Sequence, residues 1–159
     1  MSKPAAPQVG QQAALPIDSS LFFKLVRVVN LTARPFVETL SKAHQLSLNE
    51  WRVMIVLASH PGVPARELVS ITGLDKMSVS RALASLGRHR RLTKKPDPHD
   101  ARRTLLWLNA AGLKLYRTIG TPAAARESQL FGEVTPAEMG QLSRTIDKLI
   151  DALSEPEQA

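Results

Sequence analysis

Apolar side chains recur along much of the chain at intervals of three and four residues, which predicts a mainly α-helical fold. The first such segment covers residues 18–43 and contains Pro35, which we expect to kink or split the helix because proline lacks an amide hydrogen. The next helix is predicted to begin at Ser47, whose spacing to Glu50 is that of a capping box. Residues 51–58 are almost all apolar, so this helix is predicted to be covered on nearly every side.

Two short helices and two short strands are predicted in the middle of the chain. The helices, residues 64–72 and 75–89, are separated by Gly73, and their apolar positions face one another as in a helix-turn-helix. The segments LTKKP and RTLLWL are predicted strands joined by the turn-rich residues 97–102, which indicates a β-hairpin. A β-hairpin that follows a helix-turn-helix is the wing of a winged helix.

Two further helices are predicted after the hairpin. Asn109 is the predicted N-cap of the first, and Thr121–Pro122 either bends that helix or begins a new one. Thr135 and Glu138 form a second capping box at the start of the last helix.

The last helix carries an apolar seam at intervals of three and four residues, as in a coiled coil. The seam consists of Met139, Leu142, Ile146, Leu149 and Leu153. One interpretation is that the seam rests on the core of the same chain. The other is a subunit interface, which is favoured because a helical chain with only 4% aromatic residues would otherwise leave the seam exposed.

The helix of residues 75–89 separates its side chains into two faces. At about 100° per residue, one face gathers Val79, Ala82, Leu83 and Leu86. The opposite face carries Arg81 and Arg88, with Met77 and Ala84 beside them and Ser78, Ser80 and Ser85 on the flanks. This outer face has no acidic side chain, whereas a solvated helix usually mixes both charges. Arginine and serine can hydrogen-bond base edges and phosphates in a major groove, although a cationic helix without a ligand would have the same pattern.

The charge of the chain is concentrated around these elements. Residues 64–103 hold ten basic and four acidic side chains, which is most of the formal net charge of +7. Clustered cations on a folded unit indicate a nucleic-acid partner. An anionic membrane surface is the alternative, but the segment lacks the aromatic or leucine-rich face that would enter lipid.

Several classes of chemistry are excluded or disfavoured by composition. The chain has no cysteine, which excludes disulfides, thiol redox sensing and thiolate metal sites. Its four histidines are scattered, and it has no phosphate-binding loop or serine nucleophile motif, so we expect no enzyme, cofactor or metal site. No window is apolar enough for a membrane span. Residues 1–17 are predicted to be a disordered lead-in to a cytoplasmic protein, and residues 154–159 a C-terminal tail.

At the hairpin the sequence resembles the MarR family of bacterial transcription regulators, over roughly residues 20–153. The most specific match is PDPHDARR, which contains the family's Asp-x-Arg motif as Asp100 and Arg102. The segment LWLNAAG is similar to the family's strand followed by Leu-Thr-x-x-Gly, with Asn109 in place of threonine.

Two positions depart from the family pattern. The helix of residues 75–89 corresponds to the family's recognition helix. Arg90 stands where glycine usually follows this helix, and a left-handed backbone there would cost on the order of 1 kcal/mol. Arg90 could instead be an additional phosphate contact. Lys94 stands where arginine is common, which removes the expected bidentate partner of Asp100.

The resemblance implies a winged helix-turn-helix of residues 47–108 together with dimerisation helices of residues 18–46 and 109–153. Such homodimers bind a pseudo-palindromic DNA operator, and many family members repress transcription until a small aromatic acid binds between the dimer core and the winged domain. The candidate contacts of such an effector are His44, Trp51 and Arg52, each of which could also be purely structural. Trp107 is expected to be a packing residue.

The predicted DNA contacts come from the recognition helix and the wing. They are Ser78, Ser80, Arg81, Arg88, Lys95, Arg102 and Arg103. Asp100 is expected to direct the Arg102 guanidinium through an ion pair. The alternative function is a winged helix that binds protein, or one that binds DNA without an effector.

Overall fold

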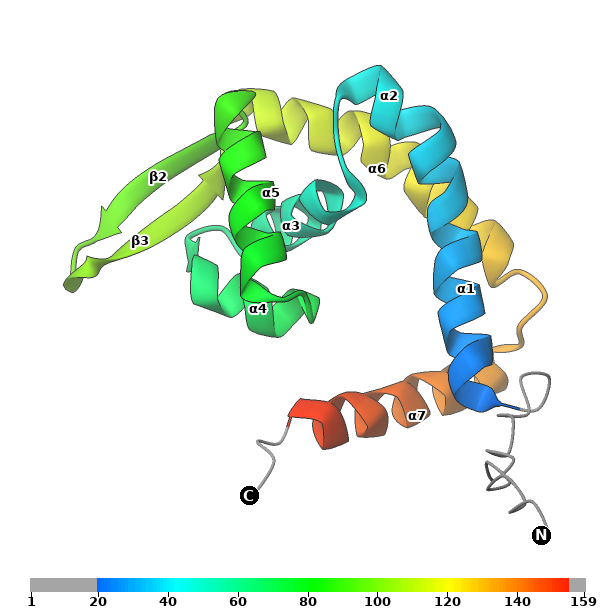
Figure 1. The fold of residues 1–159 in the computed structure, drawn as a ribbon. Helices are drawn as coiled ribbons and strands as arrows, with labels where there is room; N and C mark the ends of the chain where they lie inside the picture. Colours follow the sequence, from blue (N-terminus) through cyan, green and yellow to red (C-terminus); the bar gives the residue numbers. More distant parts are fainter. Residues whose placement is uncertain (1–19, 155–159) are drawn as a thin grey trace, which may run out of the picture. The chain divides into compact units, whose positions relative to one another are not determined.

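The computed structural model describes residues 20–154 of the chain (Figure 1). The described residues divide into two compact units, one that ends at Leu48 and one that begins at Asn49. The predicted lead-in and nearly all of the predicted tail lie outside the described residues.

The first unit consists of three consecutive helical segments. Helix α1 spans Leu21–Pro35, the π-helix η1 spans Phe36–Leu40 and α2 spans Ser41–His44. The α-helix ends at Pro35, which cannot donate a hydrogen bond, and the backbone continues as the π-helix, so the predicted split of the α-helix takes the form of a change of helix type. No residue of α1 is buried. Its exposed large apolar side chains are Leu21, Phe22, Phe23, Leu25, Val26, Val28, Val29 and Leu31.

The second unit is a winged helix-turn-helix followed by two long helices. Its elements are α3 (Leu48–Ser59), β1 (Val63–Pro64), α4 (Ala65–Thr72), α5 (Lys76–Arg88), β2 (Leu92–Asp97), β3 (Asp100–Leu108), α6 (Ala110–Leu130) and α7 (Pro136–Ser154). The core gathers fully buried side chains from successive elements: Met54 and Leu57 of α3, Leu68 of α4, Leu86 of α5 and Ile119 of α6. The predicted fold class, mainly α with a small β-hairpin wing, is confirmed. None of the described helices has the length and apolar character needed to cross a bilayer.

The sheet has one strand more than the sequence predicted. Its order is β1-β3-β2, and Val63 and Pro64 pair with Leu106 and Leu105 of β3. Pro64 was expected in the first turn of a helix, whereas it belongs to this edge strand and precedes α4 as its N-cap. Two residues are too short to show alternation, and proline is tolerated at a sheet edge because the missing amide faces away from the ladder.

The two helices after the wing begin with the predicted caps. The side chain of Asn109 accepts the amide hydrogen of Gly112 at 3.0 Å, and Glu138 accepts hydrogen bonds from the amide and hydroxyl of Thr135 at 2.9 and 2.6 Å. Helix α6 continues through Pro122, so the alternative that a new helix begins there is wrong. A single proline removes one ladder hydrogen bond, and the turns on both sides keep theirs.

The apolar seam of α7 is not packed into the core of the chain. Helix α7 has no buried residue, and Leu142, Ile146 and Leu149 are each about 40% exposed, at 39%, 38% and 42%. Leu153 is 86% exposed. The interpretation that the seam rests on the same chain is therefore wrong for most of its length.

Candidate nucleic-acid interface

A left-handed glycine and an acidic cap shape the corner between α4 and α5. Gly73 ends α4 at φ 65°, and its amide donates to the carbonyl of Val69. Asp75 then caps α5, accepting the amide of Ser78 at 2.9 Å and its hydroxyl at 2.6 Å. The hydroxyl and then the amide of Ser78 hold the pKa of Asp75 below its ordinary value. The lowered pKa means that this cap stabilises the fold at neutral pH and loses its effect as pH falls through that value.

Helix α5 turns the predicted side to solvent. Val79, Ala82, Leu83 and Leu86 are buried, whereas Met77, Ser80, Arg81, Ala84 and Arg88 are exposed. Asp75 itself is exposed at the N-cap, before the first helical residue, and its hydrogen bonds occupy the Ser78 hydroxyl. The exposed face of α5 is thus free of acidic side chains, and Ser78 has a capping contact in addition to its predicted role.

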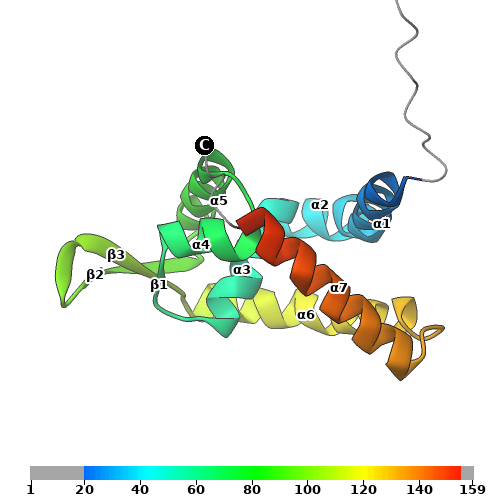
Figure 2. The same cartoon turned by 90° about the horizontal axis from the view of Figure 1, so that it is seen from below.

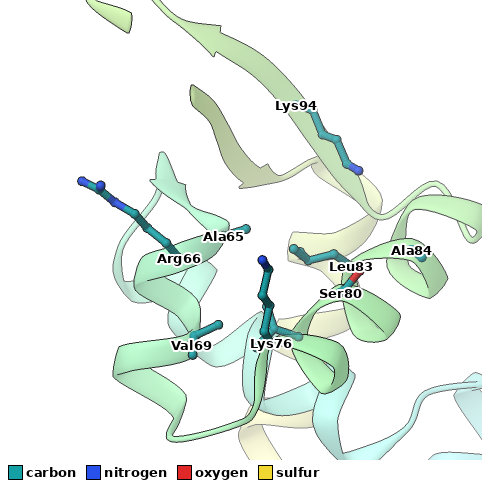
Figure 3. Close-up of a pocket in the computed structure, with 9 residues that line it drawn as sticks. Ala65, Arg66, Val69, Lys76, Ser80, Leu83, Ala84 and Lys94 are labelled. Atoms are coloured by element: carbon teal, nitrogen blue, oxygen red, sulfur yellow. The ribbon is translucent and has the colours of Figure 1, made fainter. Parts of the chain in front are cut away.

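Beside this helix, a groove of about 580 Å³ lies between α4, α5 and β2 (Figure 3). Its lining residues are Ala65, Arg66, Val69, Lys76, Val79, Ser80, Leu83, Ala84 and Lys94. Lys94 extends from β2 toward α5, and Lys76 stands at the start of α5 (Figure 3). The site residues predicted from sequence omitted Arg66, Lys76 and Lys94, although all three belong to the same basic segment of the chain.

The four cations of the hairpin have different surroundings. Arg102 is exposed, and its amide donates to Asp100 Oδ1 at 3.0 Å. The expected ion pair between Asp100 and the Arg102 guanidinium is absent between these two described residues, because the carboxylate is used to fold the tip of the hairpin. Lys95 lies over the Trp107 ring, with its Nζ 5.7 Å from the centroid. Arg103, in contrast, forms ion pairs with Glu67 of α4 and Asp97 of β2.

The end of the recognition helix has the backbone that the family pattern requires. Arg90 has φ 53°, which is the left-handed region usually occupied by glycine. Its amide donates to the carbonyl of Gly87, its carbonyl accepts from the side chain of Asn109 at 2.8 Å, and the residue is exposed. The chain therefore keeps a cation at a position where the backbone favours glycine.

The three predicted effector contacts fall in both units. His44 is the last residue of α2 in the first unit and is half-buried. In the second unit Trp51 is buried and stacks on Tyr116, with ring centroids 5.5 Å apart, and Arg52 donates to Asn49 Oδ1 at 3.3 Å. The stack gives Trp51 a packing role within its own unit. All three remain predicted effector contacts.

Known proteins resemble this chain in sequence and in fold. Residues 44–103 match the model of the MarR family. The homoprotocatechuate degradative operon repressor of Escherichia coli is 22% identical over 118 residues, which cover 74% of this chain and 80% of the repressor. The crystal structure of a MarR/EmrR family transcriptional regulator from Acinetobacter sp. ADP1 is 25% identical with a TM-score of 0.80, and the match covers 89% of this chain and 100% of the regulator. The structure of BpsR of Bordetella bronchiseptica is 22% identical with a TM-score of 0.73, and the match covers 87% of this chain and 98% of BpsR. That structure concerns the regulation of DNA binding of BpsR by 6-hydroxynicotinic acid.

The family match covers the helix-turn-helix and most of the wing, and the solved relatives share the fold over nearly all described residues. The sequence motifs of the hairpin, the winged fold and these matches agree. Residues 44–103 of the chain therefore match the MarR family of transcriptional regulators, and the chain as a whole has the fold of that family's solved members.

Proposed function

We propose that this protein is a sequence-specific DNA-binding repressor that acts as a homodimer and leaves its operator when a small aromatic acid binds. The observation that carries the proposal is the exposed face of α5, where Arg81 and Arg88 stand without any acidic side chain. Lys76 and Lys94 extend this positive surface along the groove beside the helix. A slender cationic helix of this kind fits a major groove, with phosphate contacts on both sides.

DNA binding is tested by selecting bound duplexes from a random pool and then measuring affinity at about 50 and 200 mM salt. Several phosphate contacts predict that affinity falls steeply over this range, since each contact releases counterions. Affinity that barely changes with salt would favour the alternative function, a winged helix that docks on protein through apolar contacts.

The homodimer is supported by apolar surface that the single chain leaves open. Helix α1 exposes eight large apolar side chains, and the seam of α7 is exposed as well. A monomeric soluble protein seldom exposes apolar surface on this scale. A second copy would cover these helices and place two copies of α5 about one DNA turn, roughly 34 Å, apart along a pseudo-palindromic operator.

Release by an aromatic acid is supported by the relatives. BpsR is regulated by 6-hydroxynicotinic acid, and the E. coli relative is the repressor of a homoprotocatechuate degradative operon. Aromatic carboxylates are therefore the first compounds to test for displacement of the selected DNA. His44, Trp51 and Arg52 are the proposed contacts, because an imidazole, an indole and a guanidinium can hydrogen-bond or stack on such a compound.

A further inference from the structure

The wing has a contact outside its own strands that the proposed function does not use. Arg103 of β3 approaches Glu67 of α4, with 3.4 Å between Nη2 and Oε1, and Asp97 of β2, with 3.6 Å between Nε and Oδ2. One guanidinium thus joins both strands of the wing to the helix that precedes the recognition helix.

The contact is enclosed on the side of Asp97 and open on the side of Glu67. The side chains of Asp97, Arg103 and Glu67 are 11%, 33% and 48% exposed, and the buried Nε atom of Arg103 faces Asp97 without a hydrogen bond. Asp97 also accepts the amide hydrogen of His99 at 2.9 Å, so the same carboxylate shapes the turn of the hairpin. Arg103 is half-buried, whereas Arg102 next to it is exposed.

The contact lies where the three-stranded part of the sheet gives way to the two-stranded hairpin. The edge strand β1 pairs with Leu105 and Leu106, so the three-stranded part of the sheet ends there. Further out, the wing is only a two-stranded ribbon, visible as the projecting hairpin in Figures 1 and 2, and such ribbons are marginally ordered by themselves. Arg103 lies just beyond Leu105 and connects the base of this ribbon to α4.

We propose that Arg103, held by Glu67 and Asp97, is a positioning residue that fixes the direction of the wing relative to α5, so that Arg102 reaches the DNA flanking the major-groove contact. This inference rests on the proposed DNA binding, and it reassigns Arg103, which the sequence predicted as a direct DNA contact. The role belongs to this pairing of residues and not to the Asp-x-Arg motif, whose members are Asp100 and Arg102.

The direction in which Glu67→Gln changes DNA affinity distinguishes this positioning role from a simple effect of charge. Glu67→Gln removes a negative charge beside a DNA-binding surface and releases Arg103, so charge alone predicts tighter DNA binding. If the pair positions the wing, Glu67→Gln instead weakens binding to the selected operator about two- to fivefold, the range expected for loss of one partly exposed ion pair. Glu127→Gln, which removes an exposed acidic side chain of α6, is the matched control and is expected to leave affinity unchanged or slightly higher.

Hydrogen exchange of the full-length protein without DNA gives a second measurement that does not depend on the proposed function. The amides of residues 94–104 are expected to exchange faster in Glu67→Gln and in Arg103→Glu, with the melting temperature little changed. If these amides exchange no faster in the variants than in the wild-type protein, or if Glu67→Gln tightens operator binding, the positioning role is overturned. If wild-type protein selects no DNA while the exchange results hold, the DNA-binding proposal fails and the contact within the wing stands.

Discussion

At the scale of single residues, Asp75, Asn109 and Thr135 each cap a helix by accepting the amide hydrogen of the residue three positions further along the chain. The caps at Asn109 and Thr135 could be predicted from sequence, because such a contact needs only a short polar side chain and a nearby amide. The partners of Arg103 could not be predicted, because Glu67 lies 36 residues away and meets it only after the sheet forms. The contact of Asp100 is local, but the prediction of an ion pair was wrong, because the carboxylate accepts the amide hydrogen of Arg102 and does not pair with its guanidinium.

We expect Arg81 to contribute most to the recognition of the operator's base sequence. Arg81→Ala is expected to weaken operator binding by roughly 1–3 kcal/mol and to relax preference at one position of each half-site, because a bidentate contact to guanine is lost. Affinities for a panel of single-base operator variants measure both effects. Arg126→Ala, which removes an exposed arginine of α6, is the control for net charge. An equal loss on every operator variant would identify Arg81 as a phosphate contact.

Arg90 tests the cost of the left-handed backbone. Arg90→Gly is expected to raise the free energy of unfolding by up to about 1 kcal/mol, because glycine adopts φ 53° without a steric penalty. Arg88→Gly, two residues earlier within α5, should lower it by about 1 kcal/mol, since glycine disfavours a right-handed helix. Denaturant unfolding measures both values, and a loss of stability in Arg90→Gly would contradict this account of the turn.

At the scale of elements, the helices and the hairpin could be predicted because their periodicity extends over many residues. The edge strand β1 could not, since Val63 and Pro64 are recognisable as a strand only beside Leu105 and Leu106. The sequence also did not decide whether α6 continues through Pro122. A proline removes a helix hydrogen bond locally, and tertiary packing determines whether the helix tolerates that loss.

The junction between the wing and α6 depends on a close approach at Gly112. A Cβ atom added there would clash with the carbonyl oxygen of Arg91, so Gly112→Ala is expected to cost about 1–3 kcal/mol of unfolding free energy. A Cβ at Gly120, in the same helix, would meet no atom within 4 Å, and Gly120→Ala should stabilise by roughly 0.5–1 kcal/mol. Thermal unfolding of the two variants compares these opposite signs, and equal behaviour would mean that the junction yields to the added methyl group.

At the scale of the whole molecule, the fold and the match of residues 44–103 to the MarR family are established, while the DNA binding, the regulation and the assembly are proposed. The chain is expected not to be an enzyme, and the proteins that it resembles are transcriptional regulators. The acid-free face of α5 could be predicted from its periodicity, and the structure confirms which side is exposed. Contacts that an effector would make could not be derived in this way, since residues of separate segments would have to meet around a compound that the sequence does not specify.

The seam of α7 should decide whether the protein is a dimer. Leu149→Lys is expected to convert the dimer to monomers at micromolar concentration, because it places a charge in the middle of the apolar seam. Asp151→Lys lies on the opposite side of the same helix and is expected to leave the mass unchanged. Sedimentation velocity measures both, and a monomeric wild-type protein or a Leu149→Lys variant that remains dimeric would remove this helix from the interface.

The most direct test of sequence-specific binding is selection of bound duplexes from a random DNA pool with the full-length protein at about 150 mM salt. We expect enrichment of two inverted half-sites whose centres are about 10 base pairs apart, one for each copy of α5. A pool that stays random, or a motif without inverted symmetry, would contradict it.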